Sequence, residues 1–168
     1  MNIFDLHCDT IYECQMNTLS LYENELAVSV TKLQKFEMAA QVFAIWMPDT
    51  LRGDDAINYF SRSYDHFQSE LGQHIQCISL CKTAGDLNTK IAAGKVTALL
   101  SVEGGSVLAG SLEALDMLYA KGVRMMTLTW NRDNEIGSGS GGNHTGLTKF
   151  GRQVIQRMNE LVPHQVSN

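Results

Sequence analysis

The chain has 168 residues, of which 44% are hydrophobic and 18% charged, and 13 Lys and Arg against 18 Asp and Glu give a formal net charge of -5. This composition is that of a soluble globular protein long enough to bury a core. The acidic balance, without a stripe rich in Lys and Arg, excludes a nucleic-acid-binding protein, and no apolar run approaches the ~20 residues of a membrane span.

The chain opens on an apolar segment, NIFDLHCDT at residues 2–10, which predicts a strand ending in a His-x-Asp pair. Side chains alternate faces along a strand, so we expect His7 and Asp9 to point one way and Leu6 and Cys8 the other. An imidazole and a carboxylate aimed at one point form half of a zinc or hard-metal site. The alternative is an aspartate that caps a turn beside a half-exposed histidine. The position at a strand's carboxyl end favours the metal site.

Strands and helices alternate along the rest of the chain. Nearly continuous apolar runs predict strands at residues 38–47, 96–102 and 123–130, with a shorter one at 75–80. Helical spacing of hydrophobic residues predicts helices from a cap at Asp54 or Asp55 to a stop at Gly72, from Ala84 to Ala93, from Leu112 to Gly122, and from an N-cap at Thr148 to a point before Pro163. This α/β order implies a parallel sheet of about four strand-helix units, too few for a closed eight-stranded barrel of ~250 residues.

A second polar group follows the strand at residues 96–102. On a parallel sheet the carboxylate of Glu103 would face the same edge as His7 and Asp9, and the glycines at 104–105 would let backbone or substrate approach closely. The other interpretation is a glutamate that begins a glycine-marked turn. Two polar clusters at strand ends of one α/β chain favour the functional interpretation.

The third strand end leads into the polar loop WNRDNE, residues 130–135, which indicates either a substrate pocket or a solvated loop with Trp130 covering the core. The G-x-G-x-x-G pattern at residues 137–142 follows a polar run rather than a strand. It therefore predicts a flexible loop and not a dinucleotide site.

The four cysteines give no sign of a disulfide framework. They contain no Cys-x-x-Cys pair, and the N-terminus lacks the basic-then-apolar layout of a signal peptide. We therefore expect a cytoplasmic protein with reduced thiols.

Five collinear segments together resemble the membrane (renal) dipeptidase family of zinc peptidases, among the amidohydrolase-like barrels. They are DLHCDT at residues 5–10, AQVFAIW at 40–46, SVEGG at 101–105, GVRMMTLTWNRDNEIGSG at 122–139 and GLTKFGRQVIQRMNEL at 146–161. The resemblance implies part of a TIM (β/α)8-like barrel. It also implies a two-zinc centre that hydrolyses dipeptides, including those with a C-terminal D-residue.

The resemblance also assigns roles by position. His7 and Asp9 are the expected ligands of one zinc, and Glu103 is the expected carboxylate bridging both, so that a metal-activated water attacks the peptide carbonyl. Trp130 stands where mammalian members have a substrate-contacting histidine, and a TWN sequence there is similar to bacterial relatives. Trp130 and Asn131 are therefore the expected substrate-binding residues.

The family pattern continues past the point where this sequence diverges. In the family an Asp-x-Ser-His segment supplies a ligand of the second zinc, and a further histidine ligand and a catalytic aspartate follow, whereas residues 162–168 read VPHQVSN. We therefore expect a single domain over residues 1–168 with a divergent tail at 162–168. We expect no catalytic residue within residues 1–168.

The isolated chain is accordingly expected to have little or no activity. We also expect it to form a homo-oligomer through its open sheet edge. The alternatives are a non-catalytic half-barrel remnant or interaction module, and another metal-dependent amidohydrolase.

Overall fold

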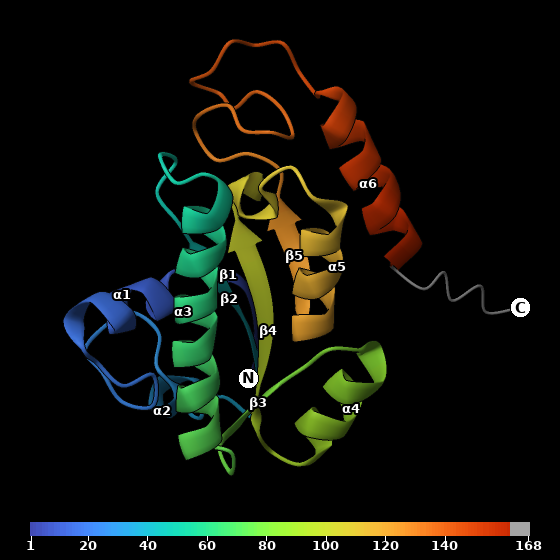
Figure 1. The fold of residues 1–168 in the computed structure, drawn as a ribbon. Coiled ribbons are helices and arrows are strands. Elements are labelled where there is room, and N and C mark those ends of the chain that lie inside the picture. The colour runs from blue at the N-terminus through green and yellow to red at the C-terminus, as the bar shows by residue number, and fades with distance from the viewer. Residues whose placement is uncertain (162–168) are drawn as a thin grey trace, which may run out of the picture.

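The computed structural model describes residues 1–161, which fold around a parallel sheet of five strands (Figure 1). Along the chain the elements are β1 (Asn2–Cys8), α1 (Thr10–Asn17), α2 (Val30–Leu33), β2 (Met38–Trp46), α3 (Gly53–Gln73), β3 (Ile78–Leu80), α4 (Ala84–Ala92), β4 (Val96–Glu103), the 3-10 helix η1 (Gly105–Leu108), α5 (Leu112–Lys121), β5 (Val123–Thr127) and α6 (Lys149–Leu161). Every strand pair described is parallel, which confirms the predicted α/β class.

The sheet is a segment of a barrel that does not close within residues 1–161. Its strands follow the order β1-β2-β4, and β4 pairs with β3 along Val96–Ala98 and with β5 along its last residues. β1, β3 and β5 each have one hydrogen-bonded neighbour in the described part of the chain. The expected partial barrel is therefore confirmed, with open edges at β1 and at β3 and β5.

The two faces of this sheet differ. One face packs against α3 and α5, which lie in front of it in Figure 1, and the rings of Phe43 in β2 and Phe67 in α3 are 5.6 Å apart in the buried core. Strand register places Phe4, opposite Ala40, on the other face, where Leu6 and Met125 are also exposed. The sheet thus has one helix-covered face and one open face.

The helix ends follow local sequence with one correction. The N-cap of α3 is Arg52, and Asp54 and Asp55 lie in its first turn, so the predicted cap at either aspartate is wrong. Carboxylates there still interact favourably with the positive end of the helix dipole. The N-cap at Thr148 is confirmed, because its Oγ1 accepts the Gly151 N–H at 2.9 Å.

Two short helices and two strand limits differ from the sequence prediction. α1 and α2 lie in a stretch for which no helix was predicted, and β3 begins at Ile78 rather than at residue 75. β5 ends at Thr127 instead of running to Trp130, so Trp130 belongs to a loop. The predicted tail at residues 162–168 lies outside the described residues.

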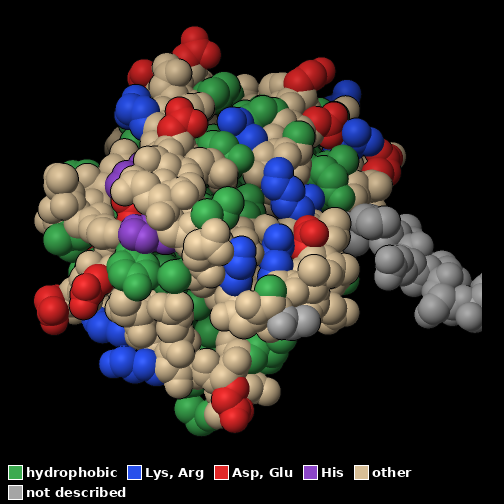
Figure 2. All heavy atoms as spheres, turned by 90° about the horizontal axis from the view of Figure 1, so that it is seen from below, with side chains coloured by type: hydrophobic (Ala, Val, Ile, Leu, Met, Phe, Trp, Pro, Cys, Tyr) green, Lys and Arg blue, Asp and Glu red, His purple; other side chains and the backbone are tan. Residues whose placement is uncertain are grey.

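The surface at the amino ends of the strands is mixed in character. Seen from below the sheet, hydrophobic side chains lie among acidic and basic ones (Figure 2). In the described part of the chain, none of the helices has the length and apolar character needed to cross a bilayer. The carboxyl ends of the strands lie at the opposite end of the molecule, beneath the loops at the top of Figure 1.

Candidate metal centre

Three side chains with metal-binding groups meet at the carboxyl edge of the sheet. His7 lies near the end of β1, Asp9 directly precedes α1, and Glu103 is the last residue of β4. His7 Nε2 is 3.4 Å from Asp9 Oδ1 and 3.6 Å from Glu103 Oε2. One ligand atom from each residue lies within 4.8 Å of the others. The structure thus brings together all three residues that the sequence suggested as ligands.

The route by which His7 and Asp9 converge differs from simple strand alternation. Asp5 pairs with Gln41 and Cys8 with Phe43, so three steps along β1 match two along β2. This irregularity places Leu6 and His7 along the same small hollow, of about 110 Å³, which Glu103 also lines. The prediction that Leu6 shares a face with Cys8 is therefore wrong, because a bulge interrupts the alternation.

The turn after β1 completes the pair. Asp9 has backbone angles φ -93° and ψ 18° at the N-cap of α1, so its carboxylate is directed by a turn and not by an extended strand. Cys8 instead packs against the hydrophobic core, and burial raises the pKa of its thiol. The imidazole of His7 and the carboxylate of Asp9 therefore converge as predicted, but through a bulge and a turn rather than through strand alternation.

The electrostatics of Glu103 suit a bound cation. Glu103 is 19% exposed, against 47% for His7, and burial is the main reason that its pKa is raised. The nearby Asp9 carboxylate raises the same pKa further, whereas His7 and a hydrogen bond from Trp130 lower it. A divalent cation would offset both the desolvation and the repulsion between the two carboxylates. The donor set of one imidazole and two carboxylates is one that zinc accepts.

An aromatic row lies beside the three ligand groups. Trp46 pairs in register with Glu103, and its ring is 5.4 Å from that of Trp130 and 4.9 Å from that of Tyr12, in edge-to-face contacts. Sequence reasoning missed Trp46 and Tyr12. Only Trp46 could have been predicted to lie near the site, because it ends an apolar strand and so reaches the carboxyl edge of the sheet.

The two glycines after Glu103 hold the loop that follows β5. The Gly104 N–H donates to Thr127 Oγ1 at 2.8 Å, and a Cβ on Gly105 would lie 2.7 Å from the carbonyl oxygen of Leu128. The space at Gly105 is thus filled by the Leu128 backbone and the Ile136 side chain, which confirms that this glycine allows backbone to approach closely. Close packing of the loop is the reason for a glycine there.

The two predicted substrate-binding residues are placed differently. Trp130 lies next to Glu103 and Trp46, whereas Asn131 lines a polar cleft together with Asp49 and Arg132. The glycine-rich segment packs over this region as a loop, and the Gly141 N–H donates to the Asn131 carbonyl oxygen at 2.7 Å. The predicted loop character of residues 137–142 is confirmed.

Comparison with known proteins identifies the family. The family described as membrane dipeptidase (Peptidase family M19) matches residues 1–162. The chain belongs to this family. The resemblance drawn from five collinear segments is thereby confirmed.

Solved structures show the same fold. The dipeptidase AC, a metallo peptidase, is similar with a TM-score of 0.86 and 22% identity, over 96% of this chain and 54% of that one. A metallo peptidase from Rhodobacter sphaeroides, liganded with a phosphinate mimic of the dipeptide L-Ala-D-Ala, is similar with a TM-score of 0.84 and 21% identity, over 96% of this chain and 56% of that one. An amidohydrolase from Pseudomonas aeruginosa is similar with a TM-score of 0.71 and 13% identity, over 95% of this chain and 43% of that one.

A relative by sequence has no described activity. It is an uncharacterised protein in the PQQ-III 3' region of Acinetobacter calcoaceticus, 30% identical over 95 residues, which are 52% of this chain and 30% of that protein. The chain thus spans less than a third of this relative and about half of the two metallo peptidase structures.

Proposed function

We propose that this chain carries the first half of the metal centre of a zinc-dependent dipeptidase, with His7, Asp9 and Glu103 as zinc ligands. The observation that carries the proposal is the meeting of these three groups within 4.8 Å at the carboxyl edge of the sheet. Catalytic sites of α/β barrels lie at this edge. When bound, zinc would supply a water acidic enough to act as a nucleophile and would polarise the scissile carbonyl.

The chain's own residues would prepare this site. His7 would hold the metal through its imidazole, and Glu103, the least exposed of the three, would hold it through its carboxylate. Trp130, which donates a hydrogen bond to Glu103, would orient that carboxylate and contact the substrate. Asn131, in the neighbouring polar cleft, would bind the more distant part of the substrate.

The substrate class we propose is a dipeptide, including dipeptides with a C-terminal D-residue. The similar metallo peptidase from Rhodobacter sphaeroides holds a mimic of L-Ala-D-Ala, which supports this class. The four thiols are free in the structure, which fits a reducing compartment, and we propose a cytoplasmic location.

We further propose that the chain alone hydrolyses dipeptides slowly or not at all. The three ligand groups that meet here are few for two zinc ions. Calorimetric titration of the 168-residue chain with zinc, together with an L-Ala-D-Ala hydrolysis assay, tests this. We expect zinc binding without appreciable turnover.

Paired variants make the titration specific. His7→Asn should abolish zinc binding, whereas His144→Asn, which changes an exposed loop histidine with φ 55°, should leave it intact. Absence of zinc binding by the folded wild-type chain would contradict the proposal and favour a non-catalytic remnant. Hydrolysis of cyclic amides or lactones, but not dipeptides, would favour another metal-dependent amidohydrolase.

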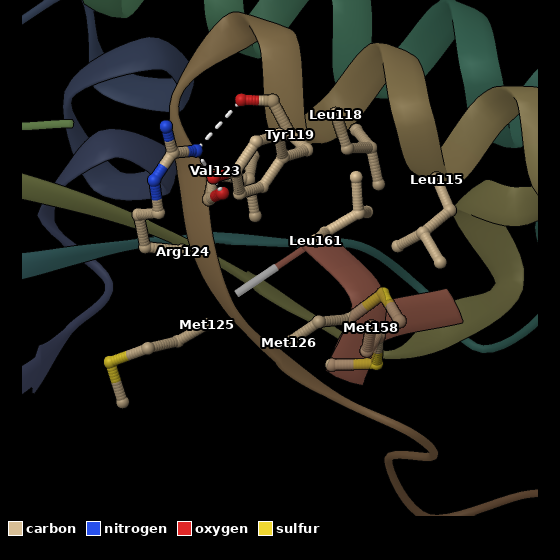
Figure 3. A pocket seen from close by; sticks show the side chains of 9 residues that line it. All are labelled: Leu115, Leu118, Tyr119, Val123, Arg124, Met125, Met126, Met158 and Leu161. Atoms are coloured by element: carbon tan, nitrogen blue, oxygen red, sulfur yellow. Dashed lines mark hydrogen bonds between the residues drawn. The ribbon is translucent and has the colours of Figure 1, made fainter. Parts of the chain in front are cut away.

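A second proposal concerns association and follows from the open edge at β5. An apolar pocket of about 80 Å³ lies between α5, β5 and α6 beside this edge (Figure 3), and Met125 lines both this pocket and the hollow at His7. Exposed apolar surface next to unpaired strand groups promotes pairing with another chain. We propose that isolated copies form a homo-oligomer there.

Sedimentation velocity across a concentration series measures this association. Met125→Lys should shift the chain toward monomer, and Met16→Lys, on the exposed side of α1, should not. A wild-type chain that stays monomeric at every concentration would rule out the homo-oligomer.

A further inference from the structure

Arg52 joins two loops at the carboxyl edge of the sheet. From the N-cap of α3, its Nη1 donates to the carbonyl oxygens of Leu51, at 2.7 Å, and Asp49, both in the loop after β2. Its Nη2 donates to the carbonyl oxygen of Asp133, at 2.6 Å, in the loop after β5. One guanidinium therefore bridges segments 81 residues apart.

Neighbouring contacts extend this bridge. Arg52 Nη1 also lies 3.4 Å from Ser106 Oγ in η1, which follows β4, and Asp49 Oδ2 accepts the Arg132 N–H at 3.1 Å. The loops after β2, β4 and β5 therefore meet at one side chain. Such a meeting fixes their relative positions through fork-shaped hydrogen bonding that only arginine provides.

An ion pair with Glu135 forms a second contact between Arg52 and the loop after β5. Glu135 Oε1 lies 4.0 Å from Arg52 Nε, while Glu135 Oε2 is buried without a hydrogen-bond partner among the described residues. The Glu135 side chain is 31% exposed, so this carboxylate can turn further toward water when the nearby cation is removed. We therefore expect loss of Arg52 to release Glu135 toward water and to loosen the loop after β5.

This loop carries the tryptophan that contacts the metal ligands. Trp130 precedes Asp133 by three residues, packs edge to face on Trp46 and donates to Glu103. Gly104, next to Glu103, lies against the same tryptophan, since a Cβ built on it would be 3.8 Å from Trp130 Cβ. The position of the loop thus sets the surroundings of Glu103.

We propose that Arg52 is a positioning residue for the metal centre: its guanidinium fork locks the loop after β5 onto the loop after β2 and thereby holds Trp130 against Trp46 and Glu103. The metal-binding part of this inference rests on the proposed function. The positioning part does not, because it concerns two rings whose arrangement is measurable without metal.

The two tryptophans are themselves the reporter. The chain contains only Trp46 and Trp130, so an exciton couplet in the far-ultraviolet circular dichroism spectrum reports their mutual geometry. We expect Arg52→Gln to lose this couplet and to bind zinc about tenfold more weakly, the scale found for residues that orient metal ligands. Arg52→Lys should behave in the same way, because an ammonium keeps the charge but lacks the fork.

Arg157→Gln is the matched control. Arg157 is 37% exposed, against 36% for Arg52, and pairs with Asp116 and Glu160 away from the carboxyl edge, so its loss should preserve both couplet and zinc affinity. If Arg52→Gln does not fold, Arg52→Lys decides the question. A wild-type couplet and affinity in Arg52→Lys would overturn the proposal, as would equal losses in Arg157→Gln.

Failure of the proposed function gives a different result. If the wild-type chain binds no zinc, the metal centre is refuted, while the couplet alone still tests whether Arg52 positions Trp130. A couplet retained in Arg52→Gln overturns the positioning role whatever the zinc titration shows.

Discussion

The two faces of the sheet place the same residue type in opposite surroundings. Phe43 in β2 is 0% exposed beneath α3, whereas Phe4 in the neighbouring strand β1 is 52% exposed on the open face. The covered face supplies the hydrophobic core, and the candidate metal ligands gather at the upper edge of the open face. Stability and function therefore depend on different sets of residues in this chain.

The largest expected effect tests this division directly. Phe43→Ala should lower the free energy of unfolding by about 3–5 kcal/mol, because it leaves a cavity in the packed face. Phe4→Ala should change it by less than about 1 kcal/mol, since the exposed ring loses little burial. Urea unfolding of both variants provides the measurement. Equal losses would show that the open face is covered in solution.

The second effect separates metal binding from folding. Glu103→Gln should weaken zinc binding about 100-fold, which corresponds to ~2.7 kcal/mol, because the half-buried anionic ligand is lost. Without metal, the variant should be no less stable than the wild type, since it removes a desolvated charge repelled by Asp9. Glu25→Gln, at an exposed position, is the control and should leave both quantities unchanged.

The raised pKa of Glu103 gives this comparison a pH dependence. Because its pKa is raised, Glu103 binds its proton more tightly in the folded chain than in the unfolded chain. Without metal, the contribution of Glu103 to the free energy of unfolding should therefore decrease as the pH rises from about 4.5, the ordinary glutamate pKa, through the raised pKa. Glu103→Gln should remove that fall. A difference in stability between wild type and variant that stays constant across this pH range would contradict the assignment.

The sequence predicted the covered face better than the open edge. Continuous apolar runs such as residues 38–47 signal a strand buried on both sides whatever their partners are, and β2 was predicted to within one residue. His7, Asp9 and Glu103 could be selected as candidates because each stands at or next to a strand end, and the structure brings their side chains together. By contrast, the bulge in β1 depends on pairing with β2, and neither strand's residue pattern encodes it.

Contacts between distant segments were beyond the reach of sequence patterns. Arg52 looks like any polar residue before a helix, and its role depends on Asp133 and Ser106, which are brought near it only by the sheet. Tyr12 follows Asp9 without a distinctive spacing. The short helices α1 and α2 were not predicted because they lie in a polar stretch without the repeated hydrophobic spacing from which helices are inferred.

A third effect tests the packing of Gly105 against the loop after β5, where the covered core meets the carboxyl edge of the sheet. Gly105→Ala would push a methyl group against Ile136 and the Leu128 carbonyl, so we expect it to cost about 1–3 kcal/mol and to weaken the Trp46–Trp130 couplet. Gly85→Ala in α4 is the matched control, because its Cβ would meet only Thr83 Oγ1 at an ordinary 3.7 Å. Alanine favours a helix over glycine, so this control should be neutral or stabilising. A retained couplet in Gly105→Ala would show that the loop tolerates displacement.

The smallest effect concerns a helix away from the carboxyl edge. Thr83 caps α4 by accepting the Asp86 N–H at 3.0 Å, while the Asp86 carboxylate accepts the Thr83 N–H at 3.0 Å in return. Thr83→Ala should therefore cost about 1 kcal/mol of stability. Thr89→Ala, which removes only a hydroxyl bonded to the Gly85 carbonyl within the same helix, should cost less. Neither should alter zinc affinity or the tryptophan couplet, because the hydroxyl groups of Thr83 and Thr89 bond to backbone groups of α4 itself. A change in zinc affinity in Thr83→Ala would mean that stability and the metal centre are coupled throughout the sheet.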